Sequence, residues 1–292
     1  MTKFKICGLR DLENTVLAST CGAEMLGFVF VSGVRRQISL MAAKKIVVDY
    51  RELVGSDGPA LVGLFANQSL HFVNRVIDSC GLDYAQLCGE EPSEYWDKIN
   101  SDVIRQVKVP VGGDFEATTR KANEEVEAVL DNGAIPILDT MEKGQLGGTG
   151  KSFNWEIAAN IPKGSKFILA GGLTPSNVTK AISVADPWMV DVSTGVETEG
   201  EKDPYKIKNF SNAVAINYFK LMSYKDEYEV ARLYSNREFI NNVKQTFEGN
   251  YKINFYLAPP IFYKKDKVTG NPIKKQFGSW TMVLFKFISL SL

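Results

Sequence analysis

The chain has 292 residues, 45% of them hydrophobic, which is enough apolar material for one large domain or for two. Its 34 basic and 34 acidic side chains leave a formal net charge of zero, which argues against nucleic-acid binding as the main task. Four cysteines without a CxxC pair and a single histidine argue against zinc and iron–sulfur centres, so we expect no metal site.

Residues 1–212 repeat one theme, in which a short apolar run is followed by a glycine or polar turn and then by a segment with helical spacing. The runs are apolar at successive positions, as expected of parallel strands covered on both faces. Eight strands are predicted, at residues 4–9, 25–30, 60–65, 84–89, 103–109, 134–140, 167–172 and 188–194. Eight strands alternating with helices predict an α/β fold, a closed (βα)8 barrel, with a doubly wound open sheet as the alternative.

The helical segments show their own signals between these strands. Within residues 116–130, apolar side chains recur on one face of a helix. Thr174 and Asp203 each precede a proline and are predicted to be N-caps, with Pro175 and Pro204 at the first helical position.

The rhythm of strand and helix stops after residue 212. Residues 238–247 have helical spacing, 252–263 are extended and broken by two prolines, and 264–275 form a basic turn. Residues 213–292 carry 12 Lys and Arg against 6 Asp and Glu, whereas residues 1–212 carry 22 against 28. This change of sign predicts two units, a barrel over 1–212 and a C-terminal extension over 213–292 that is α+β or partly ordered.

Location in the cell is indicated by three features. So few cysteines in a long chain are typical of a reduced, cytoplasmic protein. The N-terminal "MTKFKICGLR" lacks the apolar stretch of a secretory signal. The C-terminal "WTMVLFKFISLSL" is too short, and too interrupted by Lys286, to span a bilayer. We therefore expect a cytoplasmic protein that does not insert into membranes. Separately, we interpret His71, the single histidine, as a surface residue.

Two side chains at strand ends could carry acid–base chemistry. Cys7 ends the first predicted strand and Asp139 ends the sixth, on roughly opposite sides of an eight-stranded barrel. A thiol and a carboxyl facing each other across the mouth could serve as base and acid on a ligand between them. The alternatives are an inert core cysteine and a helix-capping aspartate.

Three glycine clusters, at residues 144–150, 170–172 and 193–195, follow the last three strands. Exposed backbone N–H groups there would bind an anion, and barrels often hold phosphate in this sector, although turns need glycine in any case. Arg35 and Arg36 follow the second strand, either as solvated loop charges or as ligands for an anion.

Several motifs together resemble one family, phosphoribosylanthranilate isomerase of tryptophan biosynthesis. They are "KICG" (5–8), "GFVF" (27–30), "QLCGEE" (86–91), "ILDT" (137–140), "GGTGKSFNW" (147–155), "LAGGLTPSNV" (169–178) and "VDVSTGVETEGEKD" (190–203). The resemblance implies a (βα)8 barrel and an Amadori rearrangement without a cofactor, with Cys7 as general base and Asp139 as general acid. It also implies a phosphorylated small-molecule substrate, held by Arg36, Gln86, Gly148, Gly171, Gly172, Ser193, Thr194 and Gly195.

The chain departs from the family pattern at three places. Cys88 stands where the family has histidine, the usual "SPR" is "GVRR", and Thr194 replaces a serine. The contact made by the family histidine is therefore in doubt, and Arg35 is interpreted as a solvated loop charge. Two other functions remain open, a related phosphosugar barrel such as indoleglycerol-phosphate synthase and a non-catalytic barrel that acts as an interaction module.

The C-terminal segment resembles the C-terminal region of large indolepyruvate ferredoxin oxidoreductase-type proteins. The resemblance rests on residues 218–234, 247–260 and 274–285. No cysteine follows Cys88, so we expect the extension to be non-catalytic, either a docking segment or a remnant of gene fusion. It could make the protein a homo-oligomer or bind a protein partner.

Overall fold

The computed structural model describes residues 2–55, 57–141, 152–225, 254–257, 275–278 and 280–281. The chain divides into two compact units, Met1–Tyr218 and Phe219–Leu292. The boundary expected near residue 212 lies inside the helix Pro204–Lys225, which runs past the end of the first unit.

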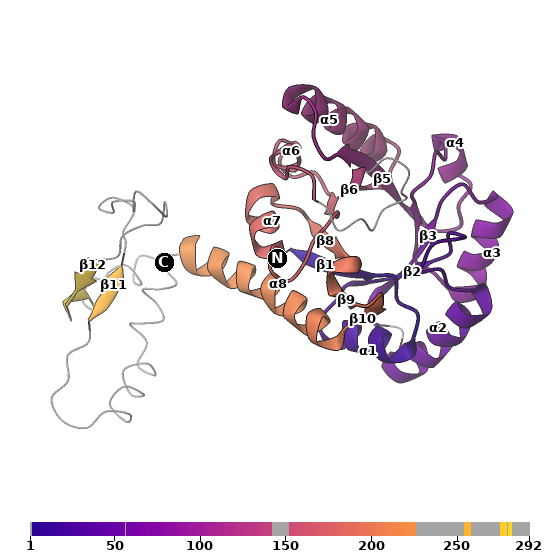
Figure 1. The fold of residues 1–292 in the computed structure, drawn as a ribbon, viewed down its shortest axis with the longest axis horizontal. Helices are drawn as coiled ribbons and strands as arrows, with labels where there is room; N and C mark the ends of the chain where they lie inside the picture. Colours follow the sequence, from indigo (N-terminus) through magenta and orange to yellow (C-terminus); the bar gives the residue numbers. More distant parts are fainter. Residues whose placement is uncertain are drawn as a thin grey trace. The chain divides into compact units, whose positions relative to one another are not determined.

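Eight parallel strands close into a barrel in chain order, each hydrogen-bonded to the next and the eighth to the first (Figure 1). The predicted closed barrel is confirmed, and the open sheet is excluded. The strands are β1 (Lys3–Cys7), β2 (Met25–Val29), β3 (Ala60–Phe65), β4 (Tyr84–Leu87), β5 (Asp102–Pro110), β6 (Ile135–Met141), β7 (Ile168–Leu169) and β8 (Met189–Val192).

Helices surround the strands, as Figure 1 shows. They are α1 (Leu12–Thr20), α2 (Leu40–Val54), α3 (Leu70–Cys80), α4 (Ser93–Trp96), α5 (Phe115–Asp131), α6 (Glu156–Ala159), α7 (Val178–Ala185) and α8 (Pro204–Lys225). The predicted face of α5 is buried at Ala122, Val126 and Val129. His71 is exposed on α3, as expected of a surface residue.

One of the two predicted N-caps is right and the other is wrong. The Asp203 carboxylate accepts from the backbone N–H groups of Tyr205 and Lys206 at the start of α8. Thr174 does not cap a helix, because its hydroxyl bonds to Ser176 instead of to a backbone N–H group. A turn occupies 174–177, closed by a bond from Thr174 N to Asn177 Oδ1, and α7 begins only at Val178.

The barrel interior is apolar near the strand starts and polar near the strand ends. Alternation along each strand brings the residues of one layer to the inner face. The apolar layer consists of Met25, Val62, Ile104, Ile135, Ile137, Ile168, Ala170 and Met189. The polar residues nearer the carboxyl ends are Lys5, Cys7, Gln86, Gln106, Asp139 and Asp191. The rigid apolar layer therefore supports a polar mouth.

A short hairpin follows β8 along the chain. A 3-10 turn (Thr194–Val196) leads into β9 (Glu197–Thr198) and β10 (Glu201–Lys202), which pair antiparallel. In the second unit, β11 (Phe255–Leu257) pairs antiparallel with β12 (Lys275–Phe277). The predicted helix at 238–247 and most of the basic turn at 264–275 lie outside the described residues.

Among the described residues, no helix is both long and apolar enough to cross a membrane. That part of the chain also holds no group of three or more His, Cys, Asp or Glu side chains that could bind a metal ion.

Candidate active site

Cys7 and Asp139 both reach the mouth of the barrel. Cys7 is the last residue of β1 and is 4% exposed. Asp139 lies near the end of β6 and is half-buried. The carboxyl ends of parallel strands gather at one face of the barrel, so both side chains project into the same opening. The structure thus places both predicted residues at the mouth of the barrel.

The Asp139 carboxylate has two hydrogen-bond donors. Thr140 N donates to Oδ1 at 2.8 Å, and Gln106 Nε2 donates to Oδ2 at 2.9 Å. Burial raises the pKa of Asp139 to about 6, and the neighbouring Asp191 carboxylate adds to this rise. The two hydrogen bonds and the Lys5 cation act in the opposite direction but do not cancel it. The group can therefore hold a proton close to neutral pH.

The Cys7 thiol is held in a mixed environment. Burial raises its pKa above the usual value, while the cations of Lys5, Lys202 and Arg36 oppose the rise. Ser193 Oγ donates to the Cys7 carbonyl at 3.0 Å and ties β1 to the loop after β8. The cations reduce the cost of forming the thiolate but do not offset burial, so the pKa of Cys7 stays raised.

A buried ion pair lies below the mouth. Lys5 Nζ contacts Asp191 Oδ1 at 2.9 Å, and the two side chains are 0% and 9% exposed. Burial lowers the pKa of Lys5, but the attraction of Asp191 outweighs it and leaves the pKa raised. Lys5 therefore remains charged, and it places a fixed cation beneath both Cys7 and Asp139.

A small pocket opens beside Asp139, where β6, β7 and β8 end. It has a volume of about 50 Å³ and is lined by Asp139, Ala170, Gly171, Gly172, Leu173, Asp191, Ser193, Thr194 and Gly195. A cavity of about 260 Å³ adjoins it and shares Gly172, Leu173, Thr194 and Gly195. The two predicted glycine loops therefore meet at one pocket.

Glycine is required at two positions of this pocket by close backbone approach. A Cβ on Gly195 would collide with the carbonyl oxygen of Leu173. Gly171 has a φ of +86°, and a Cβ there would collide with Thr140 Oγ1. The loops after β7 and β8 consequently expose backbone to the pocket without side chains in the way.

Of the predicted substrate-binding residues Gln86 and Gly148, only Gln86 lies in the part of the chain that the structure describes. Gln86, from β4, is buried at the mouth and its Nε2 lies 3.5 Å from Cys88 Sγ. Burial raises the pKa of the Cys88 thiol to about 12, so it stays neutral and cannot replace the charge of an imidazolium. Gly148, in the glycine cluster at 144–150, lies outside the described residues.

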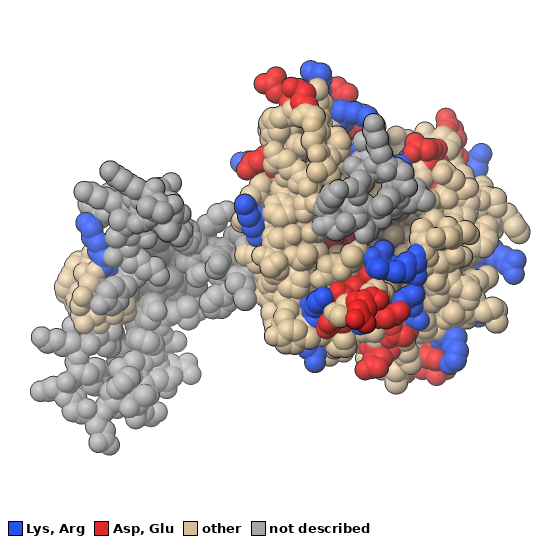
Figure 2. All heavy atoms as spheres, viewed as in Figure 1, with Lys and Arg blue, Asp and Glu red and all other residues tan. Residues whose placement is uncertain are grey.

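Arg36 lies at the rim of the mouth in a network of charges. Its Nε donates to Glu197 Oε1 at 2.6 Å, and its Nη2 donates to Thr194 Oγ1 at 2.6 Å. Lys202 Nζ contacts the same Glu197 carboxylate at 2.8 Å. Arg35, interpreted as a solvated loop charge, is 55% exposed but also contacts Glu197, at 2.5 Å. Figure 2 shows acidic side chains over β9 and β10 with basic ones beside them.

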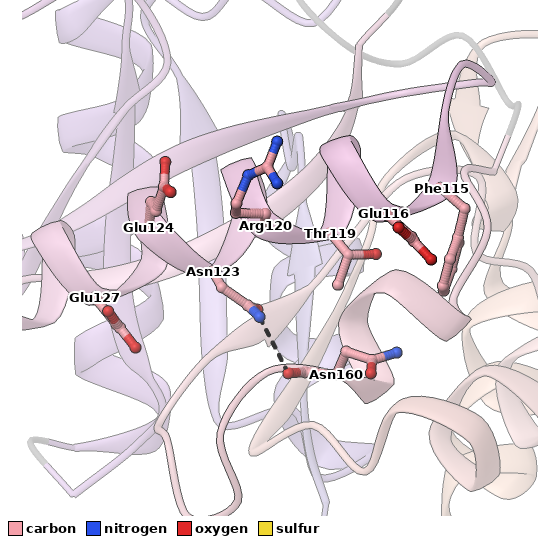
Figure 3. Close-up of a pocket in the computed structure, with 8 residues that line it drawn as sticks. All are labelled: Phe115, Glu116, Thr119, Arg120, Asn123, Glu124, Glu127 and Asn160. Carbon is pink, nitrogen blue, oxygen red and sulfur yellow. Dashed lines mark hydrogen bonds between the residues drawn. The ribbon is translucent and has the colours of Figure 1, made fainter.

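A separate cleft lies on the outer surface, between α5 and the end of α6 (Figure 3). It has a volume of about 400 Å³, and Asn123 Nδ2 donates to the Asn160 carbonyl across it. The cleft is lined by Phe115, Glu116, Thr119, Arg120, Asn123, Glu124, Glu127 and Asn160. It contains none of the predicted site residues, and the mouth of the barrel remains the candidate site.

Comparison with known proteins shows the family of the chain. A family model for N-(5'phosphoribosyl)anthranilate (PRA) isomerase matches residues 4–213. The chain belongs to this family. Two relatives with the name N-(5'-phosphoribosyl)anthranilate isomerase come from Dehalococcoides mccartyi and Geotalea uraniireducens. The first is 37% identical over 73% of this chain and 96% of its own length, and the second is 40% identical over 72% and 97%.

Solved structures of the isomerase family are similar to the barrel. The enzyme from Thermotoga maritima has a TM-score of 0.62 and 33% identity, and the match covers 74% of this chain and all of that one. A phosphoribosyl anthranilate isomerase in complex with reduced 1-(o-carboxyphenylamino)-1-deoxyribulose 5-phosphate has a TM-score of 0.59 and 31% identity, with 74% and 99% covered. Residues 184–290 also match a family of unknown function (DUF6537).

Several residues of this isomerase-family site were missed by sequence reasoning. Lys5, Gln106 and Asp191 lie inside strands, and Glu197 and Lys202 lie in the hairpin after β8. One signal was available, because charged residues are almost never fully buried unless they are paired. A lysine two residues before Cys7, in "KFKIC", therefore indicates a buried partner. Nothing in the sequence shows that Asp191 is that partner.

Proposed function

We propose that the barrel isomerises N-(5-phosphoribosyl)anthranilate to 1-(2-carboxyphenylamino)-1-deoxyribulose 5-phosphate, a step of tryptophan biosynthesis, by general acid–base catalysis without a cofactor. Membership of the isomerase family supports the reaction. One structural observation supports the mechanism above all others. A buried thiol and a carboxyl with a pKa of about 6 face one mouth, beside a pocket walled by glycine loops.

The first step needs an acid. Asp139 would protonate the furanose ring oxygen, and the bond from that oxygen to C1 breaks as the anthranilate nitrogen donates its lone pair. The products are an open-chain Schiff base with a positive charge on nitrogen and an Asp139 carboxylate. With a pKa of about 6, roughly one carboxyl in ten is protonated at pH 7, which is enough for a general acid.

The second step needs a base. The positively charged imine acidifies the C2 proton, and the Cys7 thiolate would remove it. The electron pair moves into a C1–C2 double bond, which neutralises the nitrogen and forms an enolamine. Tautomerisation to the ketone completes the rearrangement. Burial keeps the pKa of Cys7 raised, and the Lys5, Lys202 and Arg36 cations beside it lower the cost of forming the thiolate.

The anionic groups of the substrate would be held by the rim. The backbone of the loops at 171–172 and 193–195 is suited to the phosphate, with Gly148 a further contributor. Arg36 would bind the anthranilate carboxylate or the phosphate side, and Gln86 would contact the substrate from β4. The excess of positive charge around Glu197 favours an anion at this rim.

The two-part organisation extends this proposal. Residues 1–212 would carry the activity, and 213–292 would be a non-catalytic extension that docks a protein partner, mediates homo-oligomerisation or remains from a gene fusion. The sequence resemblance to the C-terminal region of indolepyruvate ferredoxin oxidoreductase-type proteins is the basis for a docking segment or a fusion remnant, whereas the family model that matches there is one of unknown function. A cytoplasmic location is consistent with a biosynthetic reaction on a soluble phosphorylated substrate.

A fluorescence assay that follows the loss of phosphoribosylanthranilate tests the proposal. We expect turnover by the wild-type chain and a loss of at least about a hundredfold in kcat for Cys7→Ala and for Asp139→Asn. Circular dichroism shows whether each variant is folded. Folded variants that turn over at the wild-type rate would contradict the assigned roles. A wild-type chain without turnover would favour the non-catalytic interaction module instead.

A further inference from the structure

Gln106 presents an unexplained buried atom beside the proposed acid. It faces the barrel interior from β5, is 8% exposed, and donates from Nε2 to Asp139 Oδ2 at 2.9 Å. Its other amide atom, Oε1, is buried and has no hydrogen-bond partner among the residues that the structure describes. Buried polar atoms in native proteins nearly always have a partner, so this acceptor calls for an explanation.

The explanation follows from the two forms that an acid must adopt. Ionised Asp139 has only acceptors at Oδ2, and it is satisfied by the Nε2 donor. Protonated Asp139 carries a hydrogen on an oxygen and needs an acceptor nearby. A primary amide offers both, because rotation about its last side-chain bond exchanges Nε2 and Oε1 with little change in shape.

Among the residues that the structure describes, only Gln106 hydrogen-bonds the Asp139 carboxylate with its side chain. The Gln86 amide also has an unpartnered Oε1, but its Nε2 bonds the Cys88 thiol. The pocket hydroxyls of Ser193 and Thr194 bond the Cys7 carbonyl and Arg36.

Thr140 contributes a backbone N–H, which only donates, and its unpartnered hydroxyl leaves β6 on the face opposite to Asp139. On β1 and β8, Lys5 is already paired with Asp191. On β5, Lys108 is in register with Asp139, but its Nζ contacts Glu90.

The ends of β1, β4 and β7 face Asp139 as well. From the end of β4, the neutral thiol of Cys88 senses Asp139 at longer range. Cys7 occupies the end of β1, where it serves as the proposed base. From β7, the pocket receives only Ala170 and Gly171, which have no polar side chain.

We infer that Gln106 is a positioning residue for the isomerisation, whose amide hydrogen-bonds Asp139 in both its ionised and its protonated form. The inference rests on the proposed function, in which Asp139 is the acid. Gln106 would hold the carboxyl in one orientation through the proton transfer, without contacting the substrate. It deepens the proposed mechanism, because the acid keeps its geometry before and after it gives up its proton.

The ionised form is tested with Gln106→Met, which keeps the length of the side chain and removes both polar atoms. Carbon-13 labelling of the aspartate carboxyls, with Asp139→Asn to assign the signal, follows the titration of Asp139 directly. We expect its pKa to rise by up to about one, a tenfold change in the protonation equilibrium, because a bond to the charged form is stronger than one to the neutral form. In the turnover assay, kcat should fall severalfold while KM stays unchanged.

The protonated form is tested in the Asp139→Asn background, where Nδ2 donates as the protonated carboxyl would. Gln106→Met in that background should lower Tm by a few degrees, because it removes the acceptor. Thr119→Val is the control, since it removes a buried, unpartnered hydroxyl from α5, at the outer cleft and away from the mouth. It should shift neither the titration of Asp139 nor kcat.

Each readout can overturn the inference. An unchanged titration and kcat in Gln106→Met would show that Gln106 does not support the acid. An unchanged Tm in the Asp139→Asn background would show that it contacts only the ionised form. Titration and melting need no turnover, so an inactive wild-type chain would contradict the proposed function while these two measurements still decide the role of Gln106.

Discussion

Arg36 and Glu197 form a two-point contact at the rim of the barrel. Nε of Arg36 lies 2.6 Å from Oε1 of Glu197, and Nη2 lies 3.1 Å from Oε2. The Glu197 side chain is only 3% exposed, whereas that of Arg36 is 15% exposed. Burial raises the pKa of Glu197, but the opposite effect of Arg36 and Lys202 is larger. The pKa is therefore lowered, and the carboxylate stays charged. A paired fork of this kind fixes the plane of the guanidinium.

Glu197→Gln should therefore weaken substrate binding more than it slows chemistry. The glutamine keeps one acceptor but loses the charge that orients Arg36, so we expect KM to rise roughly tenfold with kcat within about threefold of wild type. Steady-state kinetics measures this split. Glu201→Gln is the matched control, because Glu201 lies in the same hairpin, pairs with Arg10 and is 72% exposed. An equal rise in KM for both variants would show a general effect of the hairpin.

The two arginines should differ in the same assay. Arg36→Ala should raise KM strongly, because Arg36 points its paired guanidinium at the rim of the mouth. Arg35→Ala should have a smaller effect, since its side chain is 55% exposed and an exposed ion pair contributes about 1 kcal/mol at most. If KM rose as much in Arg35→Ala as in Arg36→Ala, the assignment of the substrate contact to Arg36 alone would be wrong.

The pH dependence of kcat/KM should show an unusually broad plateau. The active form has a Cys7 thiolate and a protonated Asp139, which together hold one proton. Its population rises up to the pKa of Asp139, about 6, because both groups are protonated below that pH. It then stays constant until Cys7 ionises, above the usual pKa of a thiol.

Kinetics between about pH 5 and 10, at constant ionic strength, measures this profile. Alkylation of Cys7 by iodoacetamide, with Cys7→Ser as the blank, reports the thiol independently of turnover. The substrate phosphate also ionises near pH 6, so the acid limb is judged from the carboxyl titration of Asp139. A fall in kcat/KM beginning near pH 7 would contradict a raised Cys7 pKa.

Asp139→Asn should stabilise the fold while it removes activity. The pKa of Asp139 is raised from 3.8 to about 6 on folding, so its favourable contribution is complete below pH 3.8 and is lost as the pH rises through 6. Above pH 6 the buried charge costs about 1–3 kcal/mol, which asparagine does not incur. Urea unfolding should show this gain at pH 8 and none at pH 4. An equal gain at both values would have another cause.

Truncation inside helix α8 should destabilise the barrel, whereas truncation at the end of α8 should not. Val214 is 2% exposed, and the Ala213 carbonyl accepts from Thr179 Oγ1 at 3.1 Å, so the barrel extends past residue 212. A chain ending at residue 212 should lose about 2 kcal/mol of stability, whereas one ending at 225 should melt like the barrel of the full chain. Calorimetry compares them. Equal melting of both truncations would place the end of the barrel at 212.

The sequence predicted the barrel well because each strand is a local signal. An unbroken apolar run such as 25–30, followed by a glycine turn, needs no distant information. Cys7 and Asp139 were also within reach, since each closes such a run. The partner of Lys5 was not, because Asp191 is 186 residues away and only closure of the sheet between β1 and β8 brings them together.

Glu197 and Gln106 were missed for different reasons. Glu197 lies in a polar segment, "ETEGEK", where a buried glutamate looks like its exposed neighbours. Gln106 stands at an inward position of β5, and its role depends on a neighbour from β6. Thr174 was wrongly predicted to cap a helix, because threonine followed by proline starts turns as well as helices, and here it starts a turn.

The polar layer at the mouth draws its members from β1, β4, β5, β6 and β8. Only a fragment that spans nearly the whole barrel contains both Lys5 and its partner Asp191, which lie on the first and last strands. Ring closure is thus a precondition for chemistry, and turnover would report an intact barrel in an all-or-none manner. If the chain were split into two fragments and these were mixed, the activity regained would be proportional to the number of barrels that had closed.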